Sequence, residues 1–166
     1  MTAPSTVGPL QITFVKRRDG QARLICTRPD GTTTETPLRP GFGVAHDLAH
    51  YVAETGLGLT EGFYGLVAQG HAIQSFERPR SERPPVGTQA LQAEAVAMAL
   101  QHIAAGTGTA HQLRPFVEAS CEGSGVPAPT GLTEALAEAL WARYHVLMAE
   151  WKALPPRSHL VLPFPG

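Results

Sequence analysis

Two histidines one helical turn apart, His46 and His50, are the side chains of this chain whose types and spacing best suit chemistry. They lie in the run GVAHDLAHYVAE, residues 43–54, which has the H-[D/E]-x-x-H pattern of helical metal sites. Residues four apart on an α-helix lie about 6 Å from each other on one face, so both imidazoles can bind one ion at about 2.0 to 2.1 Å. The pattern predicts a divalent-metal site, with zinc as the metal.

Two acidic residues belong to the same stretch. Asp47 directly follows the first histidine, where a metal-dependent hydrolase carries its general base, and we predict a catalytic role for it. Its alternative role is that of an acidic residue favoured in the first helical turn by the helix dipole. Glu54 lies about 12 Å along the helix from His46. It is therefore predicted to assist catalysis as an orienting partner, by accepting a hydrogen bond from the second ring nitrogen of His50.

A third ligand must come from elsewhere in the chain. His71, just beyond a predicted short helix, is our candidate for a metal ligand beside His46 and His50. The pair Glu118 and Glu122 can also supply a carboxylate, although such a pair more often marks a solvated helix face. The remaining histidines have no partner at ligand spacing: His102, His111, His145 and His159.

Two classes of function fit these residues. The first is a zinc-binding protein, in its sharpest form a small metal-dependent hydrolase that acts on an unknown small molecule or peptide. The second is a non-enzymatic structural or interaction protein, in which the His/Asp/Glu cluster is a buried polar network that fixes the helix to the sheet. Neither the substrate nor the oligomeric state follows from the sequence.

Composition limits the class of protein further. The chain has 166 residues, 43% of them hydrophobic, with a formal net charge of -1, which indicates one globular domain and gives no reason to expect nucleic acid or a membrane as partner. It has no apolar run of membrane-spanning length and no N-terminal targeting pattern, so a cytoplasmic location is expected. Cys26 and Cys121 are then expected to be reduced. The preference for arginine over lysine, with abundant Ala, Gly and Pro, is typical of a GC-rich bacterial genome.

The elements that must position the histidines indicate an α+β fold, a small antiparallel β-meander packed against several α-helices. Residues 10–37 alternate apolar and polar side chains, as at Ile12 and Phe14, and two Asp-Gly turns divide them into three strands. The terminal HLVLPF, residues 159–164, predicts a further short strand that can join the edge of this meander.

Five segments have helical patterns, and the first carries the histidines: 43–54, 61–70, 88–105, 109–120 and 132–154. The histidine helix should end near Thr55-Gly56, because glycine is common just beyond a helix end. Thr60 can cap the second helix. Pro115 should make the fourth segment irregular or delay its start.

Two stretches are predicted to be flexible. Residues 1–9 are rich in small residues and proline and read as a tail before the single domain of residues 10–166. Residues 77–87, ERPRSERPPVG, are charged and proline-rich, which is typical of a solvated loop. An arginine-rich loop beside a cleft could instead recognise an acidic ligand.

The run from Ala45 to Gly70, AHDLAHYVAETGLGLTEGFYGLVAQG, resembles an uncharacterised bacterial family with a proline-His-Asp-Leu-x-His-aromatic-x-apolar-Glu segment followed by a glycine, aromatic, glycine stretch. The matching residues are His46, Asp47, Leu48, His50, Tyr51, Glu54, Gly62, Phe63 and Gly65, and Ala45 stands in place of the usual proline. The resemblance implies importance for these positions without naming a reaction. A weaker similarity to zincin-type HExxH metallopeptidases is carried by His46, Asp47 and His50, and implies zinc-dependent hydrolysis.

Overall fold

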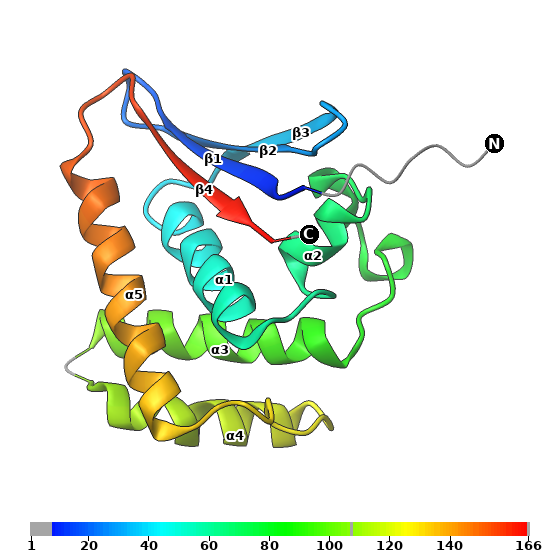
Figure 1. The fold of residues 1–166 in the computed structure, drawn as a ribbon, viewed down its shortest axis with the longest axis vertical. Helices are drawn as coiled ribbons and strands as arrows, with labels where there is room; N and C mark the ends of the chain where they lie inside the picture. The colour runs from blue at the N-terminus through cyan, green and yellow to red at the C-terminus, as the bar shows by residue number, and fades with distance from the viewer. Residues whose placement is uncertain (1–7, 107, 166) are drawn as a thin grey trace.

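Four strands form one antiparallel sheet in the computed structural model, which describes residues 8–106 and 108–165 (Figure 1). They are β1 Leu10–Lys16, β2 Ala22–Thr27, β3 Thr33–Leu38 and β4 His159–Phe164, in the spatial order β3-β2-β1-β4. The predicted meander is confirmed, and the terminal strand does join its edge, with Leu10 opposite Phe164. Alternation turns the apolar side chains of the sheet to one buried face: Leu10, Ile12, Phe14, Leu24, Cys26, Leu162 and Phe164.

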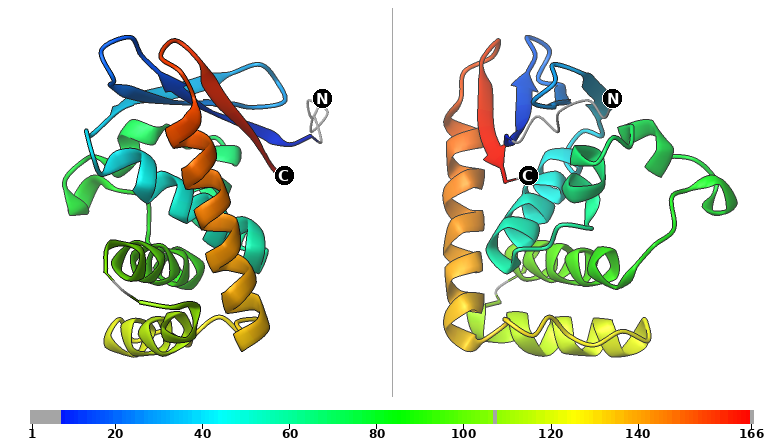
Figure 2. Two further views of the ribbon diagram at one scale, coloured as in Figure 1. Left: turned by 90° about the vertical axis from the view of Figure 1, so that its left-hand side faces the viewer. Right: turned by 45° about the vertical axis from the view of Figure 1, so that its right-hand side comes forward.

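Five α-helices lie on that face of the sheet, which confirms the α+β class. They are α1 Gly43–Leu57, α2 Phe63–Ala68, α3 Thr88–Ala105, α4 Leu113–Gly123 and α5 Glu134–Ala153, with short 3-10 helices at Ile73–Phe76, Arg80–Glu82 and Ala110–Gln112. The views in Figures 1 and 2 show α1, α3 and α4 stacked in succession below the sheet, while α5 runs along the side of the stack. The first helix, α1, is thereby enclosed by the sheet and by other helices.

This central position explains why α1 is buried on nearly all sides. Every residue from Leu48 to Glu54 is buried, which no single-faced helix would show. Two tyrosine hydroxyls tie the helix to its surroundings: Tyr51 donates to the Pro163 carbonyl oxygen of β4 at 2.9 Å, and Tyr144 of α5 donates to the Ala45 carbonyl oxygen at 3.3 Å. The histidines are thus held on a largely buried helix that is anchored to both β4 and α5.

The end of α1 differs from the prediction. Gly56 is helical, and a Cβ there would overlap the Leu140 side chain of α5, so this glycine permits close helix packing and does not terminate the helix. Termination comes at Gly58, whose φ of 64° lies in the left-handed region and whose N–H bonds to the Glu54 carbonyl oxygen.

Other helix limits follow local signals. Pro115 occupies the first turn of α4, where its missing N–H costs nothing, and the helix starts late, at Leu113, as predicted. The Thr133 hydroxyl caps α5 by accepting from the Leu136 N–H at 3.1 Å. In the described part of the chain no helix is both long and apolar enough to cross a membrane.

Of the two stretches predicted to be flexible, the tail falls largely outside the described residues, since only Gly8 and Pro9 of it belong to them. The segment 77–87 is exposed for most of its length and contains the 3-10 turn Arg80–Glu82. Its mobility stays a prediction.

Candidate metal centre

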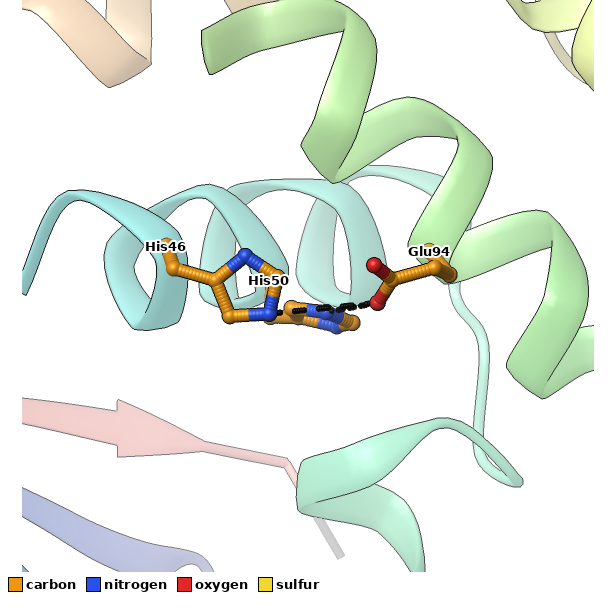
Figure 3. A group of neighbouring side chains, drawn as sticks. All are labelled: His46, His50 and Glu94. Carbon is orange, nitrogen blue, oxygen red and sulfur yellow. Dashed lines mark hydrogen bonds and ion pairs between the residues drawn. The ribbon is translucent and has the colours of Figure 1, made fainter. Parts of the chain in front are cut away.

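His46 and His50 of α1 converge with Glu94 of α3 into a group of three side chains that could hold a metal ion (Figure 3). Glu94 Oε2 lies 2.7 Å from His50 Nε2 and 3.9 Å from His46 Nε2. One ligand atom from each residue lies within 4.8 Å of the other two. Donors bonded to tetrahedral zinc at about 2.0 to 2.1 Å are about 3.4 Å apart. Small side-chain movements would therefore bring the group to zinc geometry.

The ring of His46 is oriented by Gln101, which lies two helical turns beyond Glu94 on α3. His46 Nδ1 is 2.8 Å from the Gln101 side-chain oxygen. Because an amide oxygen only accepts hydrogen bonds, Nδ1 carries the proton and Nε2 keeps its lone pair toward Glu94. Burial and the neighbouring His50 lower the pKa of His46 below 6.5. This imidazole is therefore neutral at pH 7, the form that binds a metal.

His50 lies between two carboxylates. Its Nε2 contacts Glu94. Its Nδ1 lies 3.5 Å from Glu54 Oε1, as expected for two residues four positions apart on one helix face. The Glu54 contact is electrostatic, since Nδ1 has no hydrogen-bond partner among the described residues. Burial acts to lower the pKa of His50, but the two carboxylates outweigh it and raise the pKa from 6.5 to about 10. A metal must therefore displace the proton from His50 Nε2.

Glu94 is the counterpart of this ion pair. Its side chain is about half exposed, at 48%. Burial of the rest acts to raise the pKa of Glu94, but the hydrogen bond and charge of His50 outweigh burial and lower the pKa below 4.5. The carboxyl group is therefore ionised at neutral pH, as a metal ligand must be.

Glu54 is buried and holds α2 against α1. Its carboxylate accepts the N–H groups of Tyr64 at 3.0 Å and Gly65 at 3.2 Å, at the start of α2, where backbone donors have no partner within the helix. A Cβ on Gly62 would overlap the Glu54 carboxyl group, and one on Gly65 would overlap the Thr60 carbonyl group. The GFYG segment thus permits the close approach of α2 to Glu54. The predicted capping by the Thr60 side chain is wrong, because Glu54 takes that place.

Asp47 lines the same cleft as the three donors, a hollow of about 820 Å³. Burial raises the pKa of Asp47 from 3.8 to about 7; His50 acts in the opposite direction, while Glu94 and Glu77 add to the rise. A carboxyl group with such a pKa exchanges its proton near neutral pH, as a general base must. The catalytic role of Asp47 stays a prediction.

The other candidate ligands lie apart from this group. His71 is not among the three grouped donors and does not line the cleft. Its backbone carbonyl oxygen accepts a hydrogen bond at 2.8 Å from Arg28, which directly follows β2, and this bond connects the turn to the end of that strand. Glu118 pairs with Arg114 on α4 at 2.7 Å, and Glu122 belongs to the same helix, which packs against α3 and is separated by it from α1. The third donor of the group is therefore Glu94, and not His71, Glu118 or Glu122.

Glu94 escaped the sequence analysis although a signal for it exists. It is the one Asp, Glu, Lys or Arg in the α3 sequence TQALQAEAVAMALQHIAA, a helix that is buried along much of its length. A single charged side chain in such a helix points to a polar partner on a neighbouring element, even though about half of the Glu94 side chain is exposed. What the sequence did not indicate is that this partner is the histidine pair of α1.

Fold and site together define an α+β protein in which two histidines and a glutamate could hold a metal ion. No family model, curated protein or solved structure matches the chain. The resemblances to a bacterial family and to zincin metallopeptidases therefore stay predictions.

Proposed function

We propose that this protein is a small zinc-dependent hydrolase with His46, His50 and Glu94 as ligands. The observation that supports the proposal is the convergence of these three donors in the lining of an open cleft. Three protein ligands leave the fourth zinc position for water or substrate, as in catalytic sites, whereas structural zinc sites use four. A bound Zn²⁺ would polarise a substrate carbonyl or phosphoryl group and make water more acidic.

The surrounding residues have distinct roles in this proposal. Gln101 fixes the ring orientation and the tautomer of His46. Glu54 orients the ring of His50 through Nδ1, the nitrogen that faces away from Glu94. Asp47, in the same cleft, accepts the proton that an attacking water loses. The substrate must reach these groups through the cleft that they line.

Zinc competition with a chromophoric chelator, on protein made without a histidine tag, tests the proposal. Wild type should bind about one equivalent. Gln101→Met should weaken binding about 10- to 100-fold through loss of ring orientation, and Glu94→Gln should weaken it more, through loss of a ligand. His71→Ala is the control and should bind as wild type does. Binding of less than about a tenth of an equivalent by wild type would contradict the proposal.

One observation favours the non-enzymatic alternative. Without metal, His50 already joins α1 to α3 through Glu94 at 2.7 Å and lies 3.5 Å from Glu54, which holds α2. This charged network can serve cohesion of the fold alone. Thermal melts of wild type with zinc and with a chelator separate the two functions: a hydrolase site stabilises the protein when zinc binds, and a purely structural network leaves the melt unchanged.

A further inference from the structure

Three arginines share the cleft with the metal-ligating group: Arg39, Arg80 and Arg83. All three are exposed, and none forms an ion pair with a carboxylate in residues 8–106 and 108–165. Elsewhere on the surface Arg23 and Arg114 are paired with glutamates at 2.6 and 2.7 Å. The cleft therefore gathers guanidinium groups whose charges have no partner within the described chain.

Three acidic side chains also line the cleft, and two of them contact other side chains. Glu94 contacts His50 at 2.7 Å, and Glu77 accepts a hydrogen bond from the Thr36 hydroxyl at 2.9 Å. Arg83 donates through Nε to the Arg78 carbonyl oxygen, which leaves the terminal nitrogens of its guanidinium for a ligand. Beside Asp47, the third acidic side chain of the lining, the three arginines are therefore available for an anionic partner.

Apolar side chains make up much of the remaining lining. Phe42 and Val86 are 44% and 62% exposed although both are large and apolar, and both line the cleft. Phe63 and Phe76 line it as well, with ring centroids 5.2 Å apart in a T-shaped pair. A ligand that covered these residues would remove apolar surface from water.

We propose that the cleft binds a small organic anion, with its apolar part against Phe42, Phe63 and Phe76 and its carboxylate or phosphate held by Arg80 and Arg83. Guanidinium groups bind both anions through paired N–H donors. The volume of about 820 Å³ suits a ligand of this kind. The inference rests on the proposed hydrolase only in taking this anion as the substrate class; binding itself needs no metal.

Calorimetric titration with hydrocinnamate, a carboxylate with a phenyl group, tests the inference on metal-free and zinc-loaded protein. Its uncharged amide should bind at least about tenfold more weakly, because a charge-assisted hydrogen bond is lost. Acetate, which lacks the apolar part, should also bind more weakly. Phenyl phosphate in a parallel titration shows which of the two anions is preferred.

Two charge-matched variants locate the anion. Arg80→Gln/Arg83→Gln should weaken hydrocinnamate binding at least about tenfold. Arg17→Gln/Arg18→Gln removes the same charge from the β1–β2 turn, outside the cleft, and should have no effect. Equal binding of acid and amide, equal losses in both variants, or no binding by wild type would overturn the inference.

Zinc binding measured on the same samples separates this inference from the proposed function. Arginine-dependent binding of hydrocinnamate by a protein that takes up no zinc would overturn the hydrolase and leave the anion site. Normal zinc binding without arginine-dependent binding of the anion would overturn the anion site and leave the proposed hydrolase standing.

Discussion

At His50 a proton and a metal compete for the same nitrogen. The two neighbouring carboxylates raise the pKa of this histidine to about 10 against the effect of burial. The carboxylates that stabilise the imidazolium also attract a divalent cation, because both the imidazolium and the cation are positively charged. His50 is thus the residue at which pH should control both stability and metal affinity.

The first prediction concerns these two pH dependences, which have opposite signs. Since the pKa of His50 in the folded protein, about 10, lies above the ordinary histidine value of 6.5, its stabilising effect on the metal-free protein is complete below about pH 6.5 and disappears as pH rises through about 10. Zinc affinity should instead increase with pH across this range, because binding releases the His50 proton.

Urea unfolding of metal-free wild type and His50→Gln at several pH values measures the first effect, and chelator competition measures the second. The stability difference between the two proteins should shrink toward high pH. Zinc affinity should rise by up to about tenfold per pH unit between about pH 6.5 and about pH 8.5. A zinc affinity that levels off near pH 7 would show that His50 has an ordinary pKa.

Among the elements, the packing of α1 against α3 brings the donors together, and Glu54 of α1 binds the first turn of α2. His46 meets Gln101 while His50 meets Glu94, so advancing along α1 corresponds to moving back along α3, and the two helices run antiparallel at the site. Glu54 then joins a third helix through the backbone of Tyr64 and Gly65. His50 and Glu54 of α1 thus connect this helix to α3 and to α2, respectively.

The second prediction is that the contact of Glu54 with the start of α2 stabilises the fold with or without metal. Glu54→Gln should lower the free energy of unfolding by about 1 to 3 kcal/mol, because an amide cannot satisfy both N–H groups and His50 together. Gly65→Ala should also destabilise, since its Cβ would overlap the Thr60 carbonyl group. Gly123→Ala at the end of α4, where a Cβ meets nothing within 4 Å, is the control. Denaturant unfolding with zinc and with chelator measures all three, and losses confined to the zinc-loaded protein would argue against this role of the contact.

For the whole molecule, one continuous core links the sheet to the helices. The fully buried side chains of Phe14 and Leu24 belong to the same apolar cluster as Leu100 of α3 and Leu147 of α5. The stack of sheet, α1 and α3 is therefore expected to unfold cooperatively, and the metal-ligating group should be lost together with the sheet.

The third prediction tests this at Leu24. Leu24→Ala should cost about 2 to 5 kcal/mol, through lost burial and the cavity left behind. Val161→Ala on β4, 44% exposed, serves as the control and should cost far less. Far-ultraviolet and aromatic circular dichroism during denaturation should give coincident transitions. A loss below about 1 kcal/mol at Leu24 would show that the sheet is not part of the common core.

The sequence by itself determined the elements and two of the three donors of the site. Strand alternation, Asp-Gly turns and the i, i+4 spacing of His46 and His50 are encoded by residues close together in the chain, so the meander and the histidine helix could be predicted from local periodicity. Even there, packing against α5 extended α1 past Gly56.

Only the tertiary structure decided which side chains complete the site. Glu94 lies 44 positions from His50, and Gln101 lies 55 positions from His46. No local period relates such residues; their meeting depends on the antiparallel register of α1 and α3, which the packing of the whole core sets. For the same reason His71, closer along the chain, lies outside the group, since Arg28 ties its turn to the sheet while α3 brings Glu94 to the histidines.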